Sequence, residues 1–157
     1  MERLDFASVM AVLRRNIPDE NFGNQTEFLY SLFIDVNLRP ESAIEFDQGQ
    51  VCRWINGLAR LSPNIISFYQ ETDNQRKLVN RIKERVLPLM PDSAMAAQVL
   101  YDLVLQAPNV APQKKLELTD GYTFEDENDE AIFIMEILCL AMQLRFEKRD
   151  VRKKQLL

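Results

Sequence analysis

The sequence predicts an all-α protein, an orthogonal multi-helix bundle of about six to eight helices with a buried C-terminal central helix. Three observations support this fold class. Apolar residues recur at helical spacing along most of the 157 residues. The chain has only 4 glycines, too few for an all-β fold rich in tight turns. Its last apolar segment is hydrophobic nearly all round, which is expected of a helix at the centre of a bundle.

The N-terminal part of the chain contains three candidate helices. The first begins at an N-cap residue, Asp5, and ends before Pro18, and its apolar positions are Phe6, Val9, Met10, Leu13 and Ile17. The second begins at Thr26, and its apolar positions are Phe28, Leu29, Leu32, Phe33 and Val36. The third begins near Gly49, and its apolar positions are Val51, Trp54, Ile55 and Leu58.

Two further helices are expected between residues 62 and 88. Ser62 followed by Pro63 is typical of a helix start, and the apolar residues that follow are Ile65, Ile66, Phe68 and Tyr69. Asp73 is expected to cap the next helix, which ends at Pro88 and turns inward Val79, Ile82 and Val86.

The C-terminal part begins with a helix capped by Asp92 or Ser93, whose inward residues are Ala96, Val99, Leu100 and Leu103. Pro108 and Pro112 indicate its end and a short connector. Thr123 with Asp126 three residues later resembles a capping box, and it precedes the most apolar helix, at about residues 128–149. One face of that helix carries Ile132, Met135, Cys139, Met142 and Phe146, and another carries Phe133, Ile137, Leu140 and Leu144.

We expect a single helical domain over residues 1–157, with possible loose halves at 1–90 and 91–157. The formal net charge is −5, with the first half close to neutral and the second half acidic. The N-terminus has no secretory signal pattern, and the longest apolar run, which contains Glu136, is too short to span a membrane. Cys52 and Cys139 form neither a disulfide framework nor a zinc pattern. These features predict a cytoplasmic location without a membrane partner.

The composition is also evidence against a catalytic function. The chain has no histidine, which excludes histidine-based triads, metal sites and acid–base chemistry. Glycine-rich phosphate loops are absent, and we expect no cofactor. Asp126, Asn128 and Glu130 alternate as in a calcium-binding EF-hand loop, but the expected glycine and the closing glutamate are replaced by Ala131 and Ile137. We therefore predict no metal site and no enzyme.

Residues 51–63, with the sequence VCRWINGLARLSP, carry the most specific pattern. They resemble the recognition helix and the following turn of Cro/repressor-like (XRE-type) helix-turn-helix proteins. The resemblance implies a helix in the DNA major groove, with Gln50 and Arg53 toward bases or phosphates and Arg60 near the backbone. It also implies a homodimer, because such motifs usually bind two half-sites. The rest of the chain resembles uncharacterised small proteins of Gram-positive bacteria.

This segment has two other interpretations. It can be an ordinary amphipathic helix, with Trp54 in the core and Arg53 in solvent. Residues 43–55 can also form a β-hairpin that turns at residues 47–49.

Two charge clusters are further candidates for binding. A basic run lies within the expected helix that ends at Pro88: Arg76, Lys77, Arg81, Lys83 and Arg85. It is either a solvated face or a set of phosphate contacts. An acidic cluster precedes the last helix: Glu125, Asp126, Glu127, Asp129 and Glu130. It either offsets the helix dipole, together with the basic residues that follow the helix, or imitates the charge of nucleic acid on a protein partner.

The sequence leaves three functions open. The first is a non-enzymatic regulatory protein with a helix-turn-helix-like element that associates with DNA through Gln50, Arg53, Arg60, Arg76, Lys77 and Arg81. The second is an acidic protein-binding module or inhibitor, acting as a nucleic-acid mimic toward a nuclease or a DNA-binding partner. The third and most remote is a carboxylate-dependent enzyme.

Overall fold

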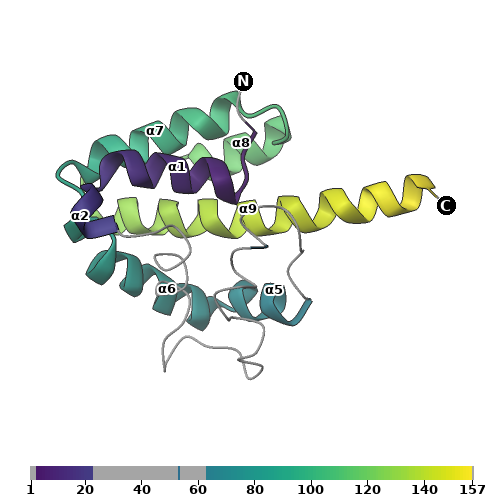
Figure 1. The fold of residues 1–157 in the computed structure, drawn as a ribbon, viewed down its shortest axis with the longest axis horizontal. Coiled ribbons are helices and arrows are strands. Elements are labelled where there is room, and N and C mark those ends of the chain that lie inside the picture. The colour runs from purple at the N-terminus through teal and green to yellow at the C-terminus, as the bar shows by residue number, and fades with distance from the viewer. Residues whose placement is uncertain (1–2, 23–52, 54–62, 157) are drawn as a thin grey trace.

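The computed structural model describes residues 3–22, 53 and 63–156 of the chain. The described residues form helices and no strands, which confirms the all-α prediction (Figure 1). In chain order the elements are α1 (Phe6–Asn16), α2 (Asp19–Phe22), α5 (Pro63–Gln70), α6 (Thr72–Arg85), the 3-10 helix η2 (Leu87–Leu89), α7 (Ser93–Gln106), α8 (Pro112–Thr119) and α9 (Glu127–Leu156). The helix predicted from Thr26, the helix predicted near Gly49 and the alternative hairpin at 43–55 lie outside the described residues.

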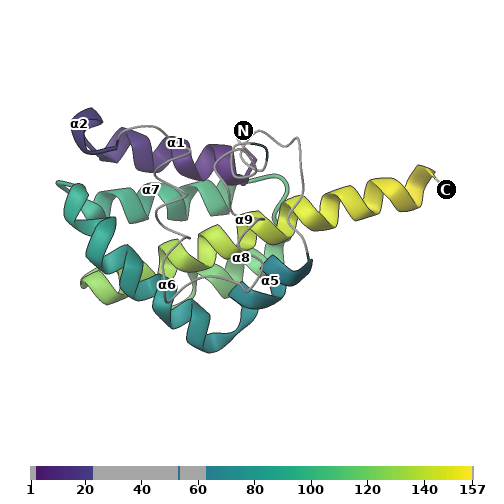
Figure 2. The same cartoon turned by 60° about the horizontal axis from the view of Figure 1, so that its bottom comes forward.

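Helix α9 is the centre of the bundle, as predicted. It contacts α1, α5, α6, α7 and α8. In Figure 1, α1 and α7 lie along one side of α9 and α5 and α6 lie along the other. The buried residues of α9 come from all round the helix: Ala131, Phe133, Ile134, Met135, Ile137, Leu138, Leu140 and Ala141. The C-terminal end of α9 runs past the other drawn helices (Figure 2).

Helix α9 is long, but its apolar part is short. In the described part of the chain, no helix has a stretch long and apolar enough to cross a membrane.

Aspartate side chains begin three of the helices. Asp5 and Ser8 form a full capping box at α1, with Ser8 N donating to Asp5 Oδ1 at 2.8 Å and Asp5 N donating to Ser8 Oγ at 2.9 Å. Asp92 accepts from the N–H of Met95 at 3.0 Å and begins α7. These caps satisfy backbone N–H groups that have no partner within the helix, and they set where each helix starts.

Two predicted caps are corrected by the structure. The cap of α9 is Asp126 and not Thr123, because Asp126 Oδ1 accepts the N–H of Asp129 at 2.8 Å. Helix α6 begins one residue before Asp73, which lies in its first turn. A negative charge is favourable there as well, because the N-terminal end of a helix carries partial positive charge.

Two further expectations in the C-terminal half differ from the structure. Pro112 does not belong to a connector but is the first residue of α8, where a proline has no N–H to lose. Val99 is 39% exposed although it is apolar, because α7 buries a different stripe: Ala96, Ala97, Leu100, Leu103 and Val104. Val99 lies beside that stripe and is not covered by α1 or α9.

A side chain from the loop after α7 holds the N-terminal segment of the chain in place. Asn109 accepts the N–H of Leu4 at 2.9 Å through Oδ1 and donates to the carbonyl of Leu4 at 3.0 Å through Nδ2. Leu4 is buried, so water cannot easily replace these two hydrogen bonds.

We predict that Asn109→Ala lowers the free energy of unfolding by about 1–3 kcal/mol, because it leaves two buried backbone groups of Leu4 without partners. Urea unfolding followed by circular dichroism measures this change. The matched control is Gln106→Ala on the exposed end of α7, which we expect to stay within about 0.5 kcal/mol of the wild type. Equal stability of the two variants would contradict the role of Asn109.

Candidate functional site

The structure describes only one of the three residues predicted from the helix-turn-helix resemblance, Arg53. Gln50 and Arg60 lie outside the described residues. Arg53 is helical and exposed. Its exposure fits a contact residue and a solvated surface residue equally well, so the expected role of this segment stays a prediction.

The basic run on α6 divides into two edges. At about 100° per residue, Arg76 and Lys83 lie about 20° apart around the helix axis. Lys77 starts a second edge about 100° away, which continues through Arg81 and Arg85. Arg76 also forms an exposed ion pair with Asp73 at 3.6 Å. The three residues predicted to contact DNA on this helix, Arg76, Lys77 and Arg81, therefore do not share one line.

The acidic cluster is smaller at the surface than the sequence indicated. Glu125, Asp126 and Glu127 are exposed and Asp129 is partly exposed. Glu130 does not belong to the exposed cluster as predicted, because it is only 5% exposed and accepts a hydrogen bond from the Ser93 hydroxyl at 2.7 Å. It joins the start of α9 to the start of α7. Its position one turn into an apolar helix, facing α7, removes it from any exposed acidic patch.

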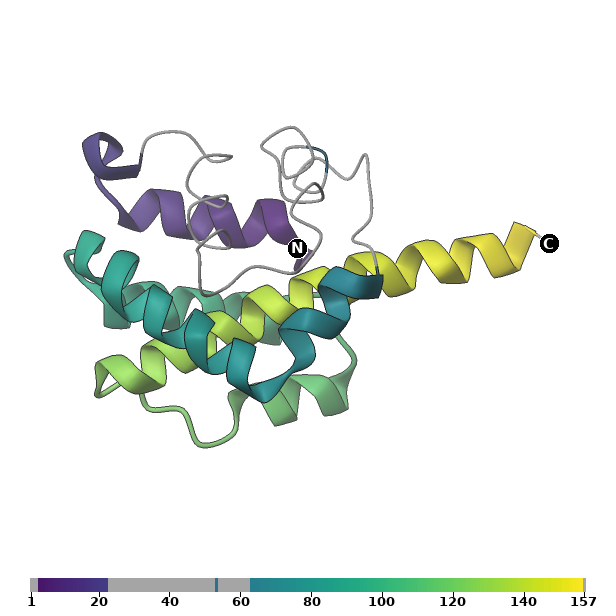
Figure 3. The same cartoon turned by 90° about the horizontal axis from the view of Figure 1, so that it is seen from below.

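A groove lies between α6 and the first turns of α9. Figure 3 shows the backbone of both helices from the α6 side. Its volume is about 370 Å³. Val79, Ile132 and Met135 form an apolar floor. The remaining lining residues are polar or basic: Thr72, Gln75, Arg76, Asn80, Lys83 and Asn128. The groove therefore combines an apolar floor with a rim on which both charged side chains are cations.

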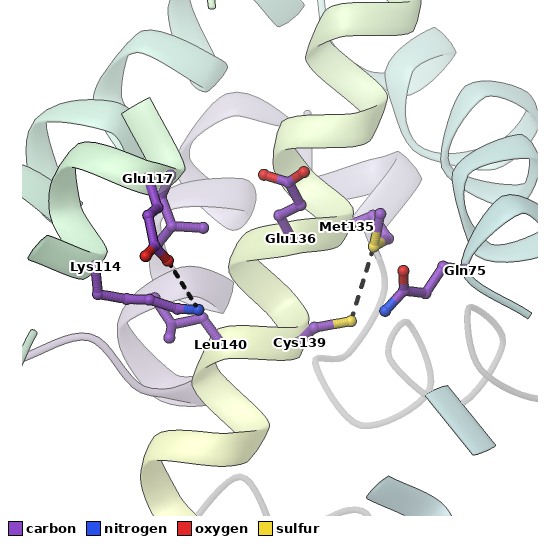
Figure 4. A pocket seen from close by; sticks show the side chains of 8 residues that line it. Gln75, Lys114, Glu117, Met135, Glu136, Cys139 and Leu140 are labelled. Atoms are coloured by element: carbon purple, nitrogen blue, oxygen red, sulfur yellow. Dashed lines mark hydrogen bonds and ion pairs between the residues drawn. The ribbon is translucent and has the colours of Figure 1, made fainter. Parts of the chain in front are cut away.

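A second pocket, of about 290 Å³, lies between α8 and α9 with Gln75 of α6 at its side (Figure 4). Figure 4 shows the α8 residues on one side of α9 and Gln75 on the other. Its lining residues are Gln75, Lys114, Glu117, Leu118, Met135, Glu136, Cys139 and Leu140. Gln75 and Met135 also line the α6–α9 groove, so the two hollows adjoin each other.

Glu136 is one of the carboxylates that line this pocket. Its burial raises its pKa above the usual value, and this effect outweighs the opposing effects of the Tyr122 hydroxyl, which hydrogen-bonds to it, and of the nearby Lys114. Lys114 itself is paired with Glu117 at 3.6 Å. Among the described residues, no cation lies within ion-pair distance of Glu136.

The loop between α8 and α9 brings Tyr122 to Glu136. Phe124 has a left-handed backbone, with φ of 57°, which costs free energy for a residue other than glycine. Packing holds it there, because Phe124 is buried and its ring lies 5.1 Å from that of Phe133 and 5.9 Å from that of Tyr101. Tyr122 stacks on Phe124 at 5.8 Å and contacts Phe133 at 5.0 Å. Burial and the Glu136 carboxylate both raise the pKa of Tyr122, so its hydroxyl stays protonated and donates.

Cys139 lies at the base of the same pocket. Burial raises its pKa to about 12, and the nearby Glu136 acts in the same direction. Its thiol therefore stays neutral at physiological pH, and its sulfur lies 3.8 Å from that of Met135. A neutral thiol is a weak nucleophile, so this cysteine lines the pocket as an unreactive side chain.

Sequence reasoning did not select Glu136, Tyr122 or Lys114 as site residues. One signal was visible, since Glu136 is the only charged residue in the apolar run of α9 between Ala131 and Met142. Lys114 and Tyr122 are common surface-type residues, and their meeting with Glu136 depends on how α8 and the following loop fold onto α9.

We predict that Glu136→Gln raises the thermal unfolding temperature at neutral pH. The raised pKa means that the folded wild type binds more protons than the unfolded chain, so its stability falls as pH rises from the ordinary carboxyl pKa through the raised one. Glutamine keeps the shape without a charge and does not show this fall. The measurement is the unfolding temperature of both proteins from about pH 4 to pH 8. The control is Glu125→Gln, at an exposed carboxylate, and an unfolding profile of Glu136→Gln that follows the wild type would contradict the prediction.

In the described part of the chain, no three His, Cys, Asp or Glu side chains lie where they could hold one metal ion. Comparison of the chain with protein-family models, with curated proteins and with solved structures finds no match in any of the three. The groove, the pocket and the charges around them are the features of the molecule that bear on its function.

Proposed function

We propose that this chain is a non-catalytic regulatory protein that binds an amphipathic segment of a partner protein in the α6–α9 groove. One observation carries the proposal: the groove has an apolar floor, and its charged lining residues, Arg76 and Lys83, are both basic. Apolar floors with polar rims are the usual form of grooves that accept the apolar face of a peptide helix.

The geometry of the two helices supports an elongated occupant. On α6 the lining residues Thr72, Gln75, Arg76, Val79, Asn80 and Lys83 repeat every three or four positions. On α9 the lining residues Asn128, Ile132 and Met135 repeat in the same way. The groove therefore follows the seam between two packed helices for about three turns of α6, which is the length over which a peptide helix presents successive apolar residues.

The charge of the groove rim determines which kind of partner segment the groove would bind. Arg76 is exposed and forms an exposed ion pair with Asp73 at 3.6 Å, and Lys83 is partly exposed. Because an exposed ion pair contributes little, both cations can reach a partner. Among the residues that the structure describes, no carboxylate lines the groove. The expected partner segment carries bulky apolar residues at helical spacing and acidic residues beside them.

We predict that a displayed random peptide library selected on this protein enriches peptides with apolar residues at helical spacing and flanking Asp or Glu. Lys83→Glu should lower the affinity for a selected fluorescent peptide about tenfold, because it reverses one rim charge. Ile132→Lys should abolish binding, because it places a charge on the floor. Fluorescence anisotropy with the synthetic peptide measures both effects.

Lys77→Glu is the matched control for this experiment. It makes the same charge change on the same helix, on the edge that does not line the groove. We expect it to leave peptide affinity within about twofold of the wild type. Equal losses in the Lys77 and Lys83 variants, or peptides that bind Ile132→Lys as well as the wild type, would contradict the groove as the binding site.

A DNA-associated function is the second proposal, and the second basic edge of α6 favours it. Lys77, Arg81 and Arg85 lie within about 80° of one another around the helix, and Arg53 is exposed. Cations aligned along one helix edge can contact successive phosphates, which supplies salt-dependent affinity without base contacts. The acidic total of the chain opposes such binding at long range but not at this edge.

We predict, under this second proposal, that the protein binds a labelled random-sequence duplex at about 50 mM salt and loses most of that affinity at about 150 mM. Arg53→Ala combined with Lys77→Glu should weaken binding at least about tenfold, whereas Lys83→Glu should change it less. Anisotropy titrations measure each affinity. Absence of binding at the lower salt concentration would exclude the DNA-associated function.

A further inference from the structure

We propose that the pocket between α8 and α9 binds a small organic ammonium ion with an apolar body. The ammonium group would pair with Glu136, and the body would contact the apolar walls formed by Leu118, Met135 and Leu140. The site is separate from the peptide groove, although the two share a wall.

The charges of the pocket select a cation over an anion. Its lining contains two carboxylates, Glu117 and Glu136, and one amine, that of Lys114. Lys114 and Glu117 neutralise each other at 3.6 Å. The Cys139 thiol adds no charge. The pocket is thus left with the negative charge of Glu136, and no cation of the described residues lies within ion-pair distance of it.

The Glu136 carboxylate has a neutral partner in the Tyr122 hydroxyl. Tyr122 donates a hydrogen bond to it from the loop before α9, and the rings of Phe124 and Phe133 hold Tyr122 in place. A half-buried carboxylate without a cationic partner is destabilised by its loss of water. A ligand ammonium would replace that water with a charge-assisted hydrogen bond to the carboxylate.

The size of the pocket limits the ligand. A volume of about 290 Å³ lies at the lower end of the range for small-molecule sites. It accepts an amine with a short branched body and excludes a nucleotide or a large ring system.

The test uses the whole chain and three probes of the same shape: 3-methylbutylamine, 3-methylbutanol and 3-methylbutanoate. We expect the amine alone to raise the unfolding temperature at millimolar concentration and to give saturable heat in calorimetry. We expect Glu136→Gln to weaken amine binding by about tenfold or more, because a hydrogen bond to a charged group is lost. The control is Glu125→Gln, which removes one exposed carboxylate elsewhere and should bind the amine like the wild type.

A second readout keeps the test independent of folding. Pairing with an ammonium ion favours the charged form of Glu136, so binding near the raised pKa should release protons, which calorimetry in buffers of different ionisation enthalpy detects. Glu136→Asp keeps the charge and should retain part of the affinity. Equal binding of the amine to Glu136→Gln, preferential binding of 3-methylbutanoate, or no binding of the amine would overturn the proposal. None of these results depends on Lys83 or on peptide binding.

Discussion

The fold depends on the need to cover α9. Between Ala131 and Ala141 this helix has one charged residue, Glu136, and nearly every other side chain is buried. An amphipathic helix can pack against one layer of partners, but a helix that is apolar all round has to be enclosed. Helices α1 and α7 cover one side, and α5, α6 and α8 cover the rest. The short helices and the loops between them are arranged around this requirement.

The cover of α9 is incomplete at the two hollows. The α6–α9 groove and the α8–α9 pocket lie on either side of Met135. Helix α8 has only 8 residues and cannot extend along α9 as α6 does with its 14. The incomplete cover explains how Glu136 can be present in the apolar run. It lines the pocket beside α8, is half-buried and has Tyr122 as a neighbour, whereas most of the run is buried.

The sequence predicted the fold class, the central position of the last helix and most of the inward residues, because these follow from the spacing of apolar side chains. Val9 and Leu13 in α1 and Val79 and Ile82 in α6 are buried as expected. Local spacing could not identify the cap of α9, since Thr123 and Asp126 are both capable of capping and the backbone of the loop decides between them. Helix α8 was missed because proline is common both in connectors and at the first position of a helix.

The residues of the candidate site were harder to predict from the sequence than the fold was. Glu130 and Glu136 are both acidic, yet one faces Ser93 in the interior and the other faces a pocket. Their difference arises from which helix lies opposite each of them, and periodicity within α9 does not contain that information. The basic run of α6 shows the same limit. Its division into two edges follows from the helix, but two of the three floor residues beside Arg76 and Lys83, Ile132 and Met135, come from α9.

The two hollows have opposite local charge although they share Gln75 and Met135. The groove has a cationic rim, and the pocket has an uncompensated carboxylate. The net charge of −5 therefore says little about what this chain binds. Each hollow is defined by the side chains that line it, and Met135, whose unbranched side chain is flexible, lines both.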